Sequence, residues 1–286
     1  MSDNTTNQYA NPDALVTTGW LAANLGDDSL RIIEVDEDTE AYGRSHIPGA
    51  IAWNWTTDLH HPLQRDYLDQ DALSELLARS GVDEDTTVIL YGGNNNWFAA
   101  YAYWLLELRG FDSVRLLDGG RLKWNVEARE TTDEVPEVTT TDFRIEGSER
   151  PGLRALRDDV LGKVGTGGTT FIDVRSPEEF SGEKLAPDHL PQEQPYVGGH
   201  VPGALNVPWS KAANEDGSFK SATELEELYG AAGLSNGSPV VSYCRIGERS
   251  AHTWFVLHEL LGRDQVANYD GSWTEYGSLV GAPVER

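Results

Sequence analysis

Cysteine and lysine are scarce in this chain of 286 residues, which carries one cysteine, Cys244, and five lysines. A single cysteine excludes an internal disulfide and any metal cluster built on several thiolates, and a free thiol suits a reducing compartment. No apolar run approaches the roughly 20 residues that span a membrane. Residues 1–8 are polar and lack the apolar core of a signal peptide. We therefore expect a soluble cytoplasmic protein.

Positive charge is also scarce. Asp and Glu number 47 against 22 Lys and Arg, which gives a formal net charge of −25. Such a surface repels nucleic acids and anionic membranes, so we expect neither as a partner. The acidic residues are spread along the whole chain, a composition typical of proteins from salt-accumulating cells. Because several-molar salt shortens the Debye length below about 3 Å and screens the self-repulsion, the sequence predicts a halophilic protein.

The single cysteine lies between a short apolar segment, residues 239–243, and a helical apolar repeat over residues 251–261. The connecting segment contains one glycine and two arginines, Arg245 and Arg249. A thiol between a strand end and a helix start faces unpaired backbone N–H groups and the positive end of the helix dipole. With neighbouring arginines, such a position lowers a cysteine pKa from about 8.5 to roughly 3.5–7.5. Since arginines are poor core neighbours, we interpret Cys244 as a reactive thiolate rather than a small buried hydrophobe.

The chain repeats itself. Residues 88–92 align with residues 240–244 at an offset of 152 residues, and the same offset carries residues 117–124 onto 269–276 without a gap. Three more pairs of segments match in the same order, namely 103–110 with 255–262, 46–50 with 200–204, and 31–36 with 170–175. Because so many ordered matches are not expected by chance, we interpret the chain as two copies of one domain.

Each copy alternates strand and helix patterns. The expected strands cover residues 32–35, 88–91 and 113–117 in the first copy and residues 170–174, 240–243 and 265–269 in the second, with helices at 71–80 and 222–232. This alternation predicts an α/β fold with a mainly parallel sheet flanked by helices in each copy. We divide the chain into a domain of residues 1–130, a polar linker of residues 131–141 and a domain of residues 142–286.

Four segments of the second copy together resemble the rhodanese family of sulfurtransferases. Residues 173–175, 200–204, 244–249 and 269–276 match the characteristic segments of that family in order. The resemblance extends from about residue 15 to residue 284 and is strongest to tandem thiosulfate sulfurtransferases of bacteria and archaea. It implies two tandem rhodanese-like domains, of which the first is catalytically silent. The sequence agrees, because Gly92 stands where the second copy has Cys244.

The resemblance implies sulfur transfer through a persulfide. The Cys244 thiolate attacks the outer sulfur of thiosulfate, sulfite leaves, and the persulfide passes its sulfur to a thiophile such as cyanide or a thiol. The arginine side chains and the backbone N–H groups of the loop hold the anionic substrate and the thiolate. The predicted substrate-binding residues are Arg245, Ile246, Gly247, Glu248 and Arg249. Asp173 and Arg175 are expected to form a buried pair that supports the site.

One substrate contact of the family is missing. Some animal thiosulfate enzymes place an arginine in the segment where this chain has residues 178–180, which read Glu-Glu-Phe. The resemblance therefore leaves the contacts to the anion open. His60 and His61 have no third ligand at a recognisable spacing, so we expect no metal and no other cofactor.

Other activities stay open. A 3-mercaptopyruvate sulfurtransferase uses the same fold and nucleophile, although its loop tends toward small residues where this chain has Arg245 and Arg249. A cysteine phosphatase or arsenate reductase needs Cys-x5-Arg, whereas Arg249 follows Cys244 after four intervening residues. A persulfide carrier that delivers sulfur to a partner protein would use the same nucleophile. Thiosulfate:cyanide sulfurtransferase activity is the prediction that the two arginines favour.

Overall fold

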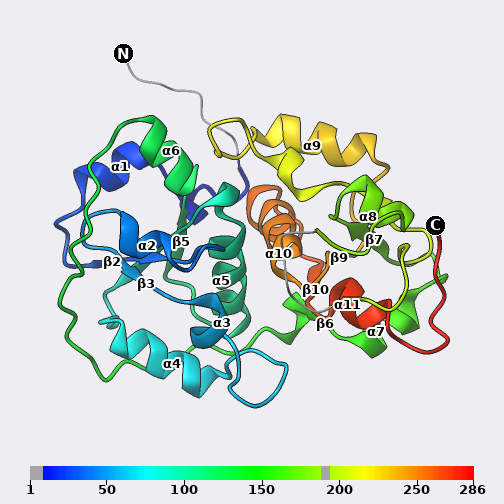
Figure 1. Ribbon diagram of the computed structural model, residues 1–286, viewed down its shortest axis with the longest axis horizontal. Coiled ribbons are helices and arrows are strands. Elements are labelled where there is room, and N and C mark those ends of the chain that lie inside the picture. Colours follow the sequence, from blue (N-terminus) through cyan, green and yellow to red (C-terminus); the bar gives the residue numbers. More distant parts are fainter. Residues whose placement is uncertain (1–8, 188–193) are drawn as a thin grey trace. The chain divides into compact units, whose positions relative to one another are not determined.

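The protein consists of two compact units in a computed structural model that describes residues 9–187 and 194–286 (Figure 1). The N-terminal unit contains Asp13–Pro151 and the short segment Ala213–Phe219. The C-terminal unit contains Gly152–Ala212 and Lys220–Arg286, together with the described residues up to Pro12. Each unit is an α/β domain built on one sheet of five strands.

The sheet of the N-terminal unit has the strand order β1-β5-β4-β2-β3, and every pair is parallel. Its strands are β1 (Leu15–Val16), β2 (Leu30–Glu34), β3 (Ile51–Ala52), β4 (Thr87–Tyr91) and β5 (Val114–Leu117). Its helices are α1 (Thr18–Ala23), α2 (Ala41–Arg44), α3 (Trp55–Asp58), α4 (Gln70–Arg79), α5 (Trp97–Leu108) and α6 (Gly120–Val126), with 3-10 turns η1 (Pro12–Ala14) and η2 (Asn94–Asn96).

The C-terminal unit repeats this arrangement with the parallel strand order β6-β10-β9-β7-β8. Its strands are β6 (Arg154–Ala155), β7 (Thr170–Asp173), β8 (Leu205–Asn206), β9 (Val240–Tyr243) and β10 (Val266–Tyr269). Its helices are α7 (Arg157–Lys163), α8 (Pro177–Ser181), α9 (Ala222–Ala231), α10 (Glu248–Phe255) and α11 (Ser272–Tyr276), with 3-10 turns η3 (Pro151–Leu153) and η4 (Trp209–Ala212) and a π-helical turn, η5 (Val256–Leu260). The predicted fold, two α/β domains with parallel sheets flanked by helices, is confirmed.

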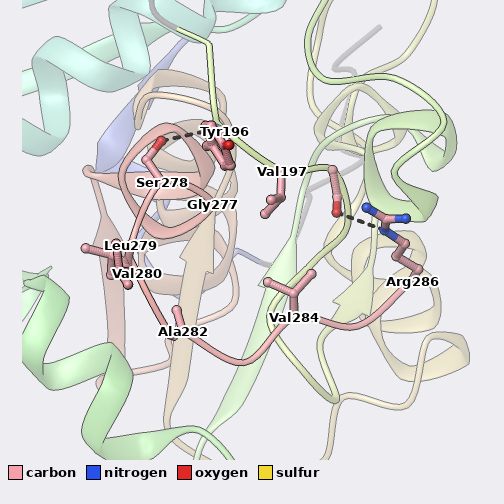
Figure 2. A pocket seen from close by; sticks show the side chains of 11 residues that line it. Tyr196, Val197, Gly277, Ser278, Leu279, Val280, Ala282, Val284 and Arg286 are labelled. Carbon is pink, nitrogen blue, oxygen red and sulfur yellow. Dashed lines mark hydrogen bonds between the residues drawn. The ribbon is translucent and has the colours of Figure 1, made fainter.

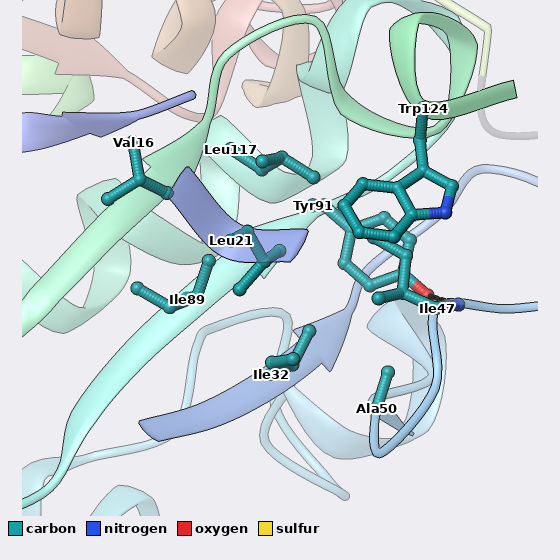
Figure 3. Close-up of a cluster of buried hydrophobic side chains, with 9 residues drawn as sticks. All are labelled: Val16, Leu21, Ile32, Ile47, Ala50, Ile89, Tyr91, Leu117 and Trp124. Carbon is teal, nitrogen blue, oxygen red and sulfur yellow. Dashed lines mark hydrogen bonds between the residues drawn. The ribbon is translucent and has the colours of Figure 1, made fainter. Parts of the chain in front are cut away.

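The central strands are apolar on both faces, because helices cover both sides of a parallel sheet. In the N-terminal unit, Ile89 and Tyr91 of β4 lie in one cluster with Ile32 of β2, and Trp124 of α6 packs against them (Figure 3). All four side chains are buried. The equivalent cluster of the C-terminal unit is built on Val241 and Tyr243 of β9. Burial of these strands fixes where their carboxyl ends emerge, and those ends carry the loops that follow β4 and β9.

The boundary between the units lies later in the chain than residues 131–141. The Thr132 N–H donates to the His46 carbonyl at 2.9 Å, and the Ile145 N–H donates to Ser74 Oγ at 3.1 Å. The Arg150 N–H donates to the Leu108 carbonyl at 2.8 Å. Polar composition indicated an inter-domain linker at residues 131–141, but these hydrogen bonds tie residues 131–150 to the N-terminal unit. The division by contacts accordingly falls after Pro151.

The segment Ala213–Phe219 comes from the second half of the sequence but packs within the N-terminal unit. The Phe219 N–H donates to Asp118 Oδ1 at 2.9 Å, and Lys123 pairs with Asp216. Burial raises the pKa of Asp118 to about 6. The segment is therefore held by a carboxyl group that resists ionisation.

Asp118→Asn is expected to raise the free energy of unfolding at pH 8 by up to about 3 kcal/mol, since one pKa unit is worth about 1.4 kcal/mol. The penalty for ionised Asp118 sets in above its ordinary pKa of 3.8 and is complete above about 6. The gain should therefore shrink as the pH falls below 6 and be absent near pH 4, because an asparagine still accepts the Phe219 N–H. Denaturant unfolding at both pH values measures it.

The matched control is Asp85→Asn, which removes the same charge from an exposed position. It should change the unfolding free energy by less than about 0.5 kcal/mol at either pH. A gain in Asp118→Asn that does not depend on pH would contradict the interpretation.

Candidate active site

Cys244 directly follows β9, at the carboxyl end of a central strand, and α10 begins four residues later. Gly247 caps that helix with φ at 110°, a backbone conformation that side chains disfavour. A Cβ atom at this position would lie 2.9 Å from the Asp270 Cα. Glycine is therefore required twice, for the turn itself and for the close approach of the segment after β10. The result is a tight loop that brings backbone N–H groups back toward the cysteine.

The Cys244 side chain is completely buried within this loop. The Gly247 N–H donates to Sγ at 3.1 Å, and the Cys244 N–H donates to Ser272 Oγ at 3.0 Å. Burial opposes ionisation of the thiol, but the Arg249 charge and hydrogen bonds from Gly247 and Ser250 outweigh it. The pKa of the Cys244 thiol is consequently lowered from its ordinary value. This is the environment that favours a thiolate nucleophile.

Arg249 is held by an acidic partner. Its Nη1 and Nη2 donate to the two carboxylate oxygens of Glu179, on α8, at 2.9 Å each. Both side chains are buried, with exposed fractions of 7% and 2%. Although burial opposes it, this pairing lowers the pKa of the Glu179 carboxyl. Arg249 thus lies near Cys244 as one half of a fork-to-fork ion pair.

The other loop residues differ in exposure. The Arg245 side chain is buried, and its pKa is lowered first by burial and then by the Arg249 charge. The Arg245 carbonyl accepts the Thr274 N–H at 3.0 Å. Ile246 is the one residue of the loop 244–249 that is partly exposed, and Glu248 is 4% exposed. The loop therefore brings Cys244, two arginines and one glutamate into one buried cluster.

Asp173 and Arg175 form a completely buried ion pair at the end of β7. Arg175 Nη2 donates to Asp173 Oδ2 at 2.5 Å and to the Gly199 carbonyl at 2.7 Å. The guanidinium carbon lies 4.8 Å from the centre of the Trp273 ring, within the range of a cation–π contact. Through Trp273, whose backbone N–H donates to the Cys244 carbonyl at 3.0 Å, the pair is linked to the cysteine loop.

Sequence reasoning missed three residues of the site, Glu179, Ser250 and Ser272. Ser272 has φ at 49°, which is unusual for a residue with a side chain, and its Oγ donates to the Tyr269 carbonyl at 2.6 Å. No composition or period distinguishes it. Glu179 lies in the segment 178–180, where the arginine of some animal enzymes is missing, but nothing in that segment indicated a pair with Arg249.

The corresponding loop of the N-terminal unit cannot hold a cysteine. A Cβ atom at Gly92 would lie 2.2 Å from the Val35 carbonyl oxygen. Asn94, Asn95 and Asn96 all have positive φ, at 47°, 58° and 62°. The Asn96 Oδ1 accepts the Gly92 N–H at 2.9 Å, so a neutral amide closes the loop on itself. This unit therefore offers no nucleophile at the equivalent strand end.

A separate cavity of about 660 Å³ lies in the C-terminal unit (Figure 2). Residues 196–198 line one side of it, and residues from the stretch 277–286, which follows α11, line the other. Its lining is largely apolar, with hydrogen bonds from the Tyr196 N–H to Ser278 Oγ and from Arg286 to the Gly198 carbonyl. None of the loop residues 244–249 lines it. Among residues 9–187 and 194–286, no group of His, Cys, Asp and Glu is placed to hold a metal. No helix of the described chain is both long and apolar enough to span a bilayer.

The sequence matches the family model described as "Rhodanese-like domain" over residues 17–127 and 156–279. The chain belongs to the rhodanese-like domain family. The two matched regions correspond to the two units, so the tandem arrangement inferred from the internal repeat is confirmed. Cys244 and Glu179 lie in the second rhodanese-like domain, and Gly92 lies in the first.

Its relatives carry sulfurtransferase names. The chain is 56% identical over 276 residues to a protein of Mycolicibacterium smegmatis named "Putative thiosulfate sulfurtransferase", covering 96% of this chain and 99% of the relative. It is 50% identical over 279 residues to a protein of the same name from Haloferax volcanii, covering 96% of each. The family and these names support a sulfurtransferase.

A solved structure of the "anaerobic ergothioneine biosynthesis enzyme from Chlorobium limicola" has the same architecture, with a TM-score of 0.81. The match covers 96% of this chain and 70% of the other. Since only 22% of the residues are identical, this likeness concerns the fold alone.

Proposed function

We propose that the protein is a thiosulfate sulfurtransferase that transfers sulfur through a persulfide of Cys244. The observation that carries the proposal is the buried thiol itself. Its Sγ accepts the Gly247 N–H at 3.1 Å, and the Arg249 charge and neighbouring hydrogen bonds lower its pKa despite burial. Thiolates are the reactive form of cysteine in such substitutions.

The first half-reaction needs no proton. The Cys244 thiolate attacks the outer sulfur of thiosulfate, a new sulfur–sulfur bond forms, and the bond to the sulfonate group breaks with its electron pair leaving on sulfite. One negative charge on the thiolate becomes one negative charge on the persulfide. Arg245 and Arg249 supply positive charge for the dianionic donor within an otherwise acidic protein, and the backbone N–H of Gly247, which donates to Sγ, faces the new persulfide.

The surrounding parts have supporting roles in this proposal. The Asp173–Arg175 pair holds Trp273 and hence the cysteine loop, and Glu179 orients Arg249. The first domain, with Gly92 at the equivalent position, is a structural copy that performs no chemistry. A free thiol suits a reducing compartment, so we place the reaction in the cytoplasm. The acidic composition and the Haloferax volcanii relative favour a halophilic host.

The test is thiocyanate formation from thiosulfate and cyanide, measured in high potassium chloride, with 3-mercaptopyruvate as the competing donor. We expect a higher kcat/KM with thiosulfate. A preference for 3-mercaptopyruvate would make the protein a mercaptopyruvate sulfurtransferase with the same nucleophile. If the persulfide forms from thiosulfate but small thiophiles discharge it only slowly, the protein is a carrier that delivers sulfur to a partner protein.

A further inference from the structure

Glu248 is a buried carboxyl that the proposed mechanism leaves unused. It is the first residue of α10 and is 4% exposed. Its carboxyl group lies against its own backbone N–H, one peptide beyond the Gly247 N–H that donates to Cys244 Sγ. Within the described chain, no other residue forms a hydrogen bond or ion pair with this carboxyl. A carboxylate in this position would be a second buried anion beside the thiolate.

The nearby cations do not neutralise it. Both terminal nitrogens of Arg249 are bound to Glu179. The charges of Arg245 and Arg249 lower the pKa of Glu248, but each lowers it by less than burial or the Cys244 thiolate raises it. Burial first and the Cys244 thiolate second raise the pKa of Glu248 well above its ordinary value. The same cluster lowers the pKa of Cys244. Two acids whose pKa values are driven apart in this way share one proton, and the carboxyl holds it.

The first domain provides an internal comparison. The 152-residue offset places Asn96 at the position of Glu248. Asn96 turns its side chain back to the start of its own loop, where Oδ1 accepts the Gly92 N–H at 2.9 Å. In the first domain, the side chain at this position therefore contacts Gly92, the residue aligned with Cys244. Where the nucleophile is missing, the position holds a neutral amide that has no proton to give.

We propose that Glu248 is the proton donor of the second half-reaction, an inference that rests on the proposed persulfide chemistry. The outer persulfide sulfur is bonded to Sγ and so lies about 2 Å from it. As an anion it is a poor electrophile. The Glu248 carboxylic acid transfers its proton to this sulfur, an acceptor thiolate attacks it, and the Cys244 thiolate leaves with the electron pair of the broken bond.

This step balances. One carboxylic acid, one persulfide anion and one thiolate become one carboxylate, one neutral organic persulfide and the Cys244 thiolate, and Glu248 then regains a proton from water. Thiolate attack on thiosulfate requires no proton transfer. The two half-reactions should therefore depend differently on Glu248.

The experiment compares the two half-reactions in the wild type and in Glu248→Gln. Each protein is loaded with thiosulfate, freed of donor, and discharged with dithiothreitol, while intact-mass spectrometry follows the gain and loss of one sulfur atom. The variant should load at nearly the wild-type rate. It should discharge more slowly by about 10²-fold, the lower end of what general acid catalysis contributes. Glu178→Gln, an exposed position on α8, is the matched control and should leave both rates unchanged.

The pH profile distinguishes proton donation from a structural role. At fixed dithiothreitol thiolate concentration, wild-type discharge should slow as the pH rises through the pKa of Glu248, because the carboxyl loses its proton. The Glu248→Gln profile should lack this limb. The other titratable or charged groups on the loop, on α10 and on the elements packed against it are Cys244, Arg245, Arg249, His252, Tyr243, His258, Glu259, Tyr269, Lys211 and Glu179. All of them remain in the variant. If the variant's discharge rate no longer falls at high pH, that fall in the wild type is therefore due to Glu248.

Several outcomes would overturn the inference. Equal slowing of loading and discharge would make Glu248 structural, and unchanged discharge would remove it from the chemistry. If the variant does not fold, the wild type is tested in heavy water instead. Discharge should then slow, because it includes the proton transfer from Glu248, whereas loading should not. If the wild type takes no sulfur from thiosulfate, the proposed function fails instead. In that case the Cys244 persulfide is formed with inorganic polysulfide, and its discharge rate in the wild type and in Glu248→Gln still tests the role of Glu248.

Discussion

Cys244→Ser is expected to abolish sulfur transfer and to leave the fold intact. The chain contains no other thiol, so no second residue can carry the persulfide. A serine hydroxyl is not ionised at neutral pH, and the Arg249 charge that lowers the cysteine pKa cannot close so large a gap. Loss of a covalent nucleophile should lower kcat by at least about 10³-fold. Thiocyanate formation from thiosulfate and cyanide, in high potassium chloride, measures the loss.

The fold of the variant must be shown separately. Serine can still accept the Gly247 N–H and has nearly the same volume, so the circular dichroism spectrum and the unfolding midpoint should stay close to those of the wild type. Mass spectrometry should detect no added sulfur after exposure to thiosulfate. Residual transfer above a few per cent, in a folded variant free of wild-type enzyme, would show that Cys244 is not the sulfur carrier.

The nucleophile and the fold could be predicted because their signals are local and repeated. The match of residues 88–92 with 240–244 gives both the second copy and the missing cysteine of the first. The expected helix at 71–80 corresponds to α4, Gln70–Arg79, and the expected strand at 265–269 corresponds to β10, Val266–Tyr269. Alternating strands and helices leave few topologies besides a parallel sheet.

The partners of the loop could not be predicted in the same way. Glu179 is 70 residues away from Arg249 in sequence, and nothing local marks an ion pair over that distance. Ser272 acts through a backbone conformation, φ at 49°, that residue type alone does not predict. The segment Ala213–Phe219 has turn composition like many surface loops, yet it joins the N-terminal unit. Each of these features depends on contacts between elements that only the fold brings together.

Arg249→Ala is expected to lower both activity and stability. It removes the charge that favours the Cys244 thiolate, so the pKa of the thiol should rise and the activity limb should move to higher pH. Loss of a charged hydrogen-bonding partner for the anion, worth roughly 1.5–3 kcal/mol, should lower kcat/KM for thiosulfate by about 10- to 150-fold at neutral pH. Removing one partner of a buried pair also leaves Glu179 unpaired, which costs about 3–5 kcal/mol of stability.

A double variant separates these two effects. Replacing Glu179 by leucine and Arg249 by methionine removes both charges while keeping the buried volume filled, and such replacements of buried ion pairs are often neutral or stabilising. The unfolding free energy should therefore return toward the wild-type value, while kcat/KM stays low and the thiol still titrates at higher pH. Thiol alkylation rates measured against pH follow that titration directly. Recovery of activity together with stability would mean that Arg249 serves only to hold the loop, and that the thiolate and the donor anion depend on Arg245 and the backbone N–H groups.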